Sequence, residues 1–131
     1  MILDWARGVA GGDLSTKSIA DIGCGPGTTL DWLEGTDRLV GLDLSTVALN
    51  LAKEATGANL IQGNATSLPL RDEGMDMVLA LDMFEHLEDP ESAASEVFRI
   101  LQPGGWLVAT VPAWPFLPRG AGPPVRASKG P

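Results

Sequence analysis

Three glycines and two aspartates are the residues whose types and spacing could do chemistry. The glycines are at positions 23, 25 and 27, and they follow an apolar run that begins at Ser18 and contains Asp21. A glycine turn directly after a strand allows backbone angles and close ligand approach that a Cβ atom forbids. Such a turn is typical of nucleoside-cofactor sites, and its simpler interpretation is a tight connection from a strand to a helix.

The spacing of these glycines separates two kinds of cofactor. Dinucleotide-binding turns follow the pattern G-x-G-x-x-G, whereas here the third glycine comes one position earlier. A pyrophosphate would also be repelled by Asp21, since both carry negative charge. The turn therefore favours a nucleoside cofactor that has no pyrophosphate.

Asp43 ends a second apolar run, which begins at Arg38, and it follows Gly25 by 18 positions. An acid about 20 residues beyond a glycine turn is where a ribose-binding carboxylate lies in a βαβ unit. The alternative role is to cap the helix that follows, but Ser45 suits that purpose equally well. We therefore predict that Asp43 binds ribose hydroxyls.

These motifs resemble those of class I S-adenosylmethionine-dependent methyltransferases of the small-molecule type (methyltransferase type 11-like), whose first motif reads D-x-G-C-G-x-G. Four further stretches resemble the family in the right order, and the resemblance covers roughly residues 18–117. The four stretches are Asn59–Leu70 at the adenine segment, Asp76–Asp82 at the fourth strand, Met83–Pro90 in the loop after it, and Leu101–Val108 at the turn into the fifth strand.

The resemblance implies that S-adenosylmethionine is the cofactor. Asp21 would lie beside its methionine end, where the negative charge complements the amino group and the sulfonium. Asp43 would accept from both ribose hydroxyls, while Asn64 and Ala65 flank the adenine. The predicted cofactor-binding residues are Asp21, Gly23, Cys24, Gly25, Asp43, Leu44, Asn64, Ala65, Leu81 and Asp82, the last two facing the methionine part, and no metal site is predicted.

His86 is the only histidine, and it comes shortly after the fourth strand. Its position makes it the candidate base that removes a proton from an oxygen or nitrogen acceptor. Two alternatives are a histidine that only hydrogen-bonds nearby backbone and a role for Glu85 instead. Trp114 and Phe116 could line an acceptor pocket, although the prolines around them equally suit a packed connector.

Strands and helices alternate along the chain, which predicts a parallel sheet with right-handed crossovers. We expect an α/β, Rossmann-like doubly wound sheet of five parallel strands with helices on both faces. The expected strands are 18–23, 38–43, 58–63, 75–81 and 105–111, and the expected helices are 2–10, 28–34, 45–56 and 90–101.

Composition suits one soluble domain, because 44% of the 131 residues are hydrophobic. No apolar run approaches the ~20 residues of a membrane helix and no leader opens the chain, so we expect no membrane insertion and a cytoplasmic location. Seventeen acids against nine bases argue against a nucleic-acid substrate and favour a small-molecule or lipid-like acceptor. The single cysteine, Cys24, has no base at a recognisable spacing that would make it a nucleophile.

Both ends of the chain depart from the family pattern. Only residues 1–17 precede the glycine strand, and residues 118–131 are rich in proline and glycine, with three bases and no acid. We expect residues 1–117 to form a partial, C-terminally truncated methyltransferase domain and residues 118–131 to be a disordered tail. The sheet would then lack the usual C-terminal antiparallel strand pair, and its open apolar edge at Gly105–Val111 would allow self-association.

Three functions stay open at this point. The first is methyl transfer to an oxygen, nitrogen or carbon of a small acceptor. The second is binding of S-adenosylmethionine without turnover, because both ends of the chain are short. The third is an NAD-dependent oxidoreductase, which would need the glycine spacing that this turn does not have.

Overall fold

The structure is a computed structural model, and it describes residues 2–9, 11–110 and 125–130. Its centre is a sheet with the strand order β3-β2-β1-β4-β5-β6. The strands are β1 (Ser18–Ile22), β2 (Arg38–Asp43), β3 (Asn59–Gln62), β4 (Met75–Leu81), β5 (Leu101–Thr110) and β6 (Val125–Ser128). The helices are α1 (Ile2–Val9), α2 (Thr28–Trp32), α3 (Thr46–Ala55) and α4 (Pro90–Ile100), with a 3₁₀ turn η1 (Phe84–His86).

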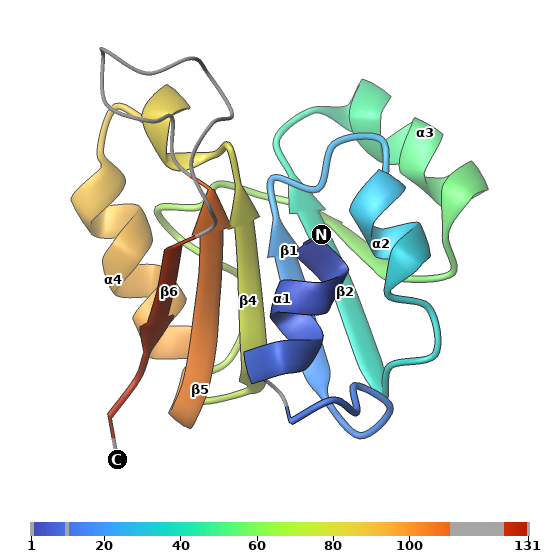
Figure 1. Cartoon of the computed structure of the whole chain (residues 1–131). Helices are drawn as coiled ribbons and strands as arrows, with labels where there is room; N and C mark the ends of the chain where they lie inside the picture. Colours follow the sequence, from blue (N-terminus) through green and yellow to red (C-terminus); the bar gives the residue numbers. More distant parts are fainter. Residues whose placement is uncertain (1, 10, 111–124, 131) are drawn as a thin grey trace, which may run out of the picture.

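Helices cover both faces of the sheet (Figure 1). One apolar layer joins α1, α2 and α3 to the sheet, and a second layer joins α4 to its other face. Successive side chains of a strand point to opposite faces. In β4, therefore, Met77 and Leu79 pack in the first layer, whereas Val78 and Ala80 pack in the second. The same alternation in β1 directs Asp21 toward the layer of α1, α2 and α3.

The parallel α/β arrangement confirms the predicted fold class. Strands β1 to β5 pair in parallel, as expected for crossovers through helices. The starts of α3 and α4 follow capping residues in the sequence. The Ser45 hydroxyl accepts a hydrogen bond from the Ala48 amide at 3.1 Å, and Asp89 accepts one from the Ser92 amide at 3.0 Å, with Pro90 in the first turn.

The predicted open edge at Gly105–Val111 is wrong, and so is disorder for the last strand. Val125–Ser128 form β6, which pairs antiparallel with Trp106–Ala109 of β5, so an antiparallel strand pair is present. Lys129 extends this pairing, because its amide donates to the Gly105 carbonyl at 2.9 Å and its Nζ donates to the Leu101 carbonyl at 2.7 Å. Backbone groups make this contact, so a segment without apolar periodicity can form it. The remaining tail positions 118–124 and 131 lie outside the described residues.

Strand β5 begins four positions earlier than predicted, at Leu101. The register shifts between the pairs Met75 with Leu101 and Met77 with Trp106, which marks a bulge over the Pro-Gly-Gly run. A bulge accommodates Pro103 because proline cannot donate to a strand ladder. Among the helices that the structure describes, none is both long and apolar enough to cross a membrane.

Candidate functional site

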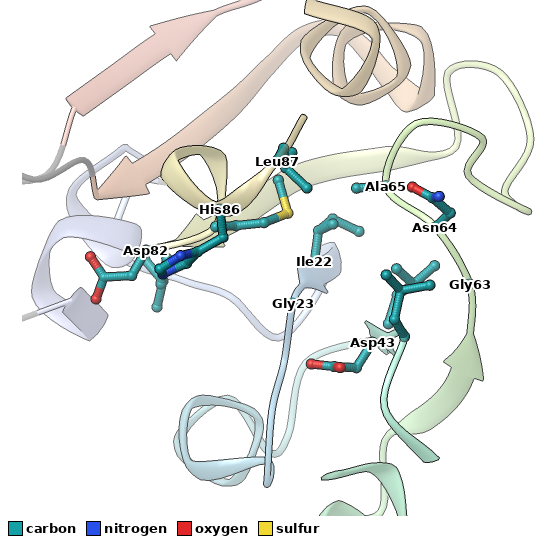
Figure 2. Close-up of a pocket in the computed structure, with 13 residues that line it drawn as sticks. Ile22, Gly23, Asp43, Gly63, Asn64, Ala65, Asp82, His86 and Leu87 are labelled. Atoms are coloured by element: carbon teal, nitrogen blue, oxygen red, sulfur yellow. The ribbon is translucent and has the colours of Figure 1, made fainter. Parts of the chain in front are cut away.

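A cavity of about 360 Å³ opens where β1, β2 and β4 end. Strand β1 lies between β2 and β4, so the strand order reverses direction at this point, and open α/β sheets bind ligands in such a crevice. The volume is in the range of small-molecule sites. The residues that line the cavity are Ile22, Gly23, Leu42, Asp43, Leu44, Gly63, Asn64, Ala65, Leu81, Asp82, Met83, His86 and Leu87 (Figure 2).

Two opposite walls of the cavity are formed by residues that follow different strands. Figure 2 shows Asp43, Gly63 and Asn64 along one wall, and Asp82 and His86 on the other side of Ile22 and Gly23. The first wall follows β2 and β3, and the second follows β4. This arrangement suits an elongated ligand that crosses over the end of β1.

The turn after β1 is fixed against β2 by its own amides. The amides of Gly23 and Cys24 both donate to the Leu42 carbonyl, at 2.7 and 3.0 Å. Gly23 has φ 78°, a left-handed conformation that glycine adopts without strain. The chain can therefore turn directly over the end of β1, and it places Gly23 in the cavity wall.

The Asp43 carboxylate is held by one amide on each oxygen. Gly25 donates to Oδ2 at 2.9 Å, and Ser45 donates to Oδ1 at 2.9 Å. An ionised carboxylate offers about four acceptor sites, so these two bonds leave each oxygen able to accept another hydrogen bond. Two neighbouring acceptors of fixed orientation at a cavity wall fit a pair of vicinal hydroxyls such as those of ribose.

The third glycine of the motif has a packing role. A Cβ atom at Gly27 would lie 3.1 Å from both the Cα and the Cβ of Ala52, and Gly27 has φ 90°. The start of α2 can therefore approach α3 closely only with glycine at this position. Gly27 does not line the cavity.

Asp21 is a buried acid without a full set of partners. Its residue is 2% exposed, and its Oδ1 has no hydrogen-bond partner among the described residues. Burial, and to a lesser extent the charge of Asp43, raises the pKa of Asp21 to about 7. An unpaired buried carboxylate oxygen is costly, and a cation bound nearby would offset that cost. Asp21 thus fits a cofactor whose methionine end carries positive charge, although it does not itself line the cavity.

The wall after β3 is shaped by a short side-chain turn. The Asn64 Oδ1 accepts from the Thr66 amide at 3.0 Å and from the Thr66 hydroxyl at 2.9 Å. Ala65, within this turn, is buried, and Leu44 lies exposed at the cavity. Small and apolar surfaces of this kind suit a planar base such as adenine.

The wall after β4 contains a strained aspartate and the histidine. Asp82 has φ 51°, a rare conformation for a residue with a side chain. The side chain of His86 is 74% exposed, and its Nε2 lies 3.8 Å from Glu85 Oε1. His86 lines the cavity, as Figure 2 shows, so it has both solvent access and ligand access.

Most of the predicted site residues meet at this one cavity. The predicted residues that line it are Gly23, Asp43, Leu44, Asn64, Ala65, Leu81, Asp82 and His86, and those that do not are Asp21, Cys24 and Gly25. Gly25 contributes by orienting Asp43. Burial raises the pKa of the Cys24 thiol to about 12, so it stays protonated at neutral pH and is a poor nucleophile. Trp114 and Phe116 lie outside the described residues.

Sequence reasoning missed five lining residues: Ile22, Leu42, Gly63, Met83 and Leu87. Each directly adjoins a predicted residue, and all but Leu87 lie at or just after the carboxyl end of a strand. The rule that ligands of parallel sheets bind at these ends could have identified the four residues at strand ends, whereas Leu87 follows the 3₁₀ turn η1.

Comparison with known proteins gives a consistent result. The methyltransferase domain pattern matches residues 20–109. The chain is 36% identical over 110 residues to a ubiquinone biosynthesis O-methyltransferase of Cupriavidus pinatubonensis, a match that covers 79% of this chain and 43% of the relative. It is 30% identical over 115 residues to a fatty-acid O-methyltransferase of Mycolicibacterium smegmatis, covering 78% of this chain and 42% of that protein.

A solved structure agrees with these sequence matches. The crystal structure of an S-adenosylmethionine-dependent methyltransferase from Mesorhizobium loti superposes with a TM-score of 0.68 at 29% identity. That match covers 73% of this chain and 47% of the solved chain. The chain thus spans less than half the length of these three proteins.

Proposed function

The chain belongs to the S-adenosylmethionine-dependent methyltransferase family, and on that premise we propose that it binds S-adenosylmethionine in the cavity and methylates a small acceptor. The acceptor is a small-molecule or lipid-like compound, methylated on oxygen, nitrogen or carbon. The names of the relatives, which refer to ubiquinone biosynthesis and to fatty acids, support this class of acceptor. The carboxylate of Asp43 at the cavity wall, fixed and still able to accept two hydrogen bonds, is the observation that carries the proposal.

Each part of the cavity would hold one part of the cofactor. Asp43 would accept from the ribose hydroxyls, and Asn64 with Ala65 would flank the adenine. The end of β4, at Leu81 and Asp82, would face the methionine part. When bound, S-adenosylmethionine supplies an electrophilic methyl group, so the protein needs mainly to align the acceptor and exclude water.

We propose that His86 is the base that takes the proton from the methyl acceptor. It lines the cavity at the end that follows β4, and its imidazole is accessible to a second ligand. A neutral imidazole nitrogen can take a proton from a hydroxyl or an amine as that group becomes a nucleophile. Replacement His86→Ala should lower turnover at saturating cofactor and leave cofactor affinity unchanged. An unchanged turnover number would remove His86 from this role.

Calorimetry with the purified chain tests cofactor binding. We expect S-adenosylmethionine and S-adenosylhomocysteine to bind and NAD not to bind. Asp43→Ala should weaken binding at least tenfold, since each lost charge-assisted hydrogen bond costs about 1.5 to 3 kcal/mol. Asp37→Ala is the matched control, because Asp37 is an exposed acid next to the opposite end of the same strand. Equal affinities of the two variants would refute the proposal that Asp43 binds the ribose. Preferential binding of NAD would refute the proposal that S-adenosylmethionine is the cofactor.

A methyl-transfer assay separates an enzyme from a domain that only binds. The cofactor carries a labelled methyl group, and the acceptors offered are a substituted phenol and a long-chain fatty acid. Label that appears in either acceptor, and is lost with Asp43→Ala, supports methyl transfer. Tight cofactor binding without label transfer to these or to extracted metabolites would favour the second function, binding without turnover.

A further inference from the structure

We infer that Thr110 is a positioning residue, which holds Asp82 in the backbone conformation that presents the end of β4 to the cavity. The inference deepens the proposed function and rests on it, because the ligand of the cavity is taken to be S-adenosylmethionine. Thr110 itself does not line the cavity, whereas Leu81 and Asp82 do. Its effect on a ligand must therefore pass through Asp82.

Thr110 and Asp82 are joined by a reciprocal pair of hydrogen bonds. The Asp82 amide donates to Thr110 Oγ1 at 2.7 Å, and the Thr110 hydroxyl donates to Asp82 Oδ1 at 3.0 Å. The sheet brings the two residues together, because Thr110 ends β5 in register with Leu81, the last residue of β4. One hydroxyl thus binds both the backbone and the side chain of the same aspartate.

The backbone of Asp82 is in a conformation that needs such support. Asp82 and Glu73 are the two residues other than glycine that have positive φ in the described part of the chain. The φ of Asp82 is 51°, in the left-handed region that side chains disfavour. Strained residues persist only where their surroundings fix them, and they cluster at ligand sites. Here the Thr110 hydroxyl is the group that fixes the amide.

Loss of the hydroxyl should change the cavity wall. If Asp82 relaxes to a negative φ, the peptides on both sides of it rotate, and Met83 moves with them. Met83 also lines the cavity, and its Cγ is 3.5 Å from where a Cβ atom of Gly23 would lie. The change would therefore reach the turn after β1 as well as the end of β4, and cofactor affinity should fall.

Two pairs of variants test this inference by calorimetry with S-adenosylhomocysteine. Thr110→Val keeps the shape of the side chain and removes the hydroxyl, and we expect affinity to fall about tenfold, the equivalent of one hydrogen bond. Thr110→Ser keeps the hydroxyl and should bind within about twofold of the parent chain. Asp82→Gly and Asp82→Ala both remove the carboxylate, but only glycine adopts positive φ without strain, so Asp82→Gly should bind more tightly than Asp82→Ala.

Hydrogen exchange at the Asp82 amide gives a readout that does not depend on the cofactor. Exchange should be faster in Thr110→Val than in Thr110→Ser, because the amide loses its acceptor. The inference is overturned if exchange is equal in these two variants, or if Thr110→Val binds as tightly as a parent chain that does bind. Failure of the parent chain to bind would instead refute the proposed function, and exchange would still decide the role of Thr110. Should Thr110→Val fail to fold, equal affinities of Asp82→Gly and Asp82→Ala would overturn the inference.

Discussion

Replacing Asp21 by asparagine should stabilise the protein at high pH. Asp21 is 2% exposed, and its Oδ1 has no hydrogen-bond partner in the described part of the chain. The alternation of β1 directs its side chain into the apolar layer of α1, α2 and α3. Burial first, and then the charge of Asp43, raises its pKa from 3.8 to about 7. Asparagine has the same shape and carries no charge at any pH, so Asp21→Asn removes the cost of the buried anion.

The sign and size of the effect follow from proton linkage. Between pH 4 and pH 7 the folded chain keeps a proton on Asp21 that the unfolded chain has released, so the stability of the parent falls as pH rises. A shift of about three pKa units corresponds to about 4 kcal/mol over the whole window. Between pH 5 and pH 8 the parent should lose roughly 2 to 3 kcal/mol from this group alone.

Urea unfolding of the parent and of Asp21→Asn, each at pH 5 and pH 8, measures this difference. The two proteins share all other titrating groups. The change with pH in the difference between their free energies of unfolding therefore isolates Asp21. Asp89→Asn is the control, because hydrogen bonds from Ser92 lower the pKa of Asp89 and it stays ionised throughout this range. The free energy of unfolding of Asp89→Asn should differ from that of the parent by the same amount at both pH values. A constant difference for Asp21→Asn as well would refute the reasoning, since it would mean that Asp21 does not titrate between pH 5 and pH 8.

Three further predictions concern the same site and its frame. Binding of S-adenosylmethionine at pH 7 should release protons, because a cation near Asp21 lowers its pKa; calorimetry in buffers of different ionisation enthalpy measures the release, and Asp21→Asn should abolish it. Gly27→Ala should destabilise the fold by about 1 to 3 kcal/mol more than Gly35→Ala, since both glycines have φ near 90° but only Gly27 approaches Ala52, and equal losses in urea unfolding would contradict this. Arg99→Met should cost about 2 kcal/mol in the same assay, because two backbone carbonyls after β3 lose a charged donor, and a loss below about 0.5 kcal/mol would show that these bonds contribute little.

Strands β1 to β4 and the location of the cavity could be predicted because the motifs that indicate them are local in the sequence. Apolar runs that end in an acid or a glycine turn gave β1 and β2 with bounds that match the structure within one residue. Parallel pairing then places the ends of these strands at one edge of the sheet, so Asp43 and Gly23 meet without any knowledge of side-chain contacts. The site residues themselves were predicted from the spacing of the glycines and acids and from the resemblance to the methyltransferase family.

The features that were missed depend on contacts between distant segments. Strand β6 forms through backbone pairing with β5. It is flanked in the sequence by prolines and a glycine, which give no sign of a strand. The link between Asp82 and Thr110 spans 28 positions, and it exists only because β4 and β5 end in register. A single sequence shows the chemistry of Thr110 but not its partner.

Asp21 and Asp82 show how the site departs from the rules that the rest of the sheet follows. One is an ionisable group in an apolar layer near the end of β1, and the other has a strained backbone just after β4. Each lowers stability in the free chain, and each adjoins or lines the cavity between the two strands. A bound cation would offset the cost of Asp21, whereas the Thr110 hydroxyl offsets the cost of Asp82 in the folded chain itself. Binding should therefore stabilise the protein most at high pH, where Asp21 is ionised, and this dependence should disappear in Asp21→Asn but persist in Thr110→Val.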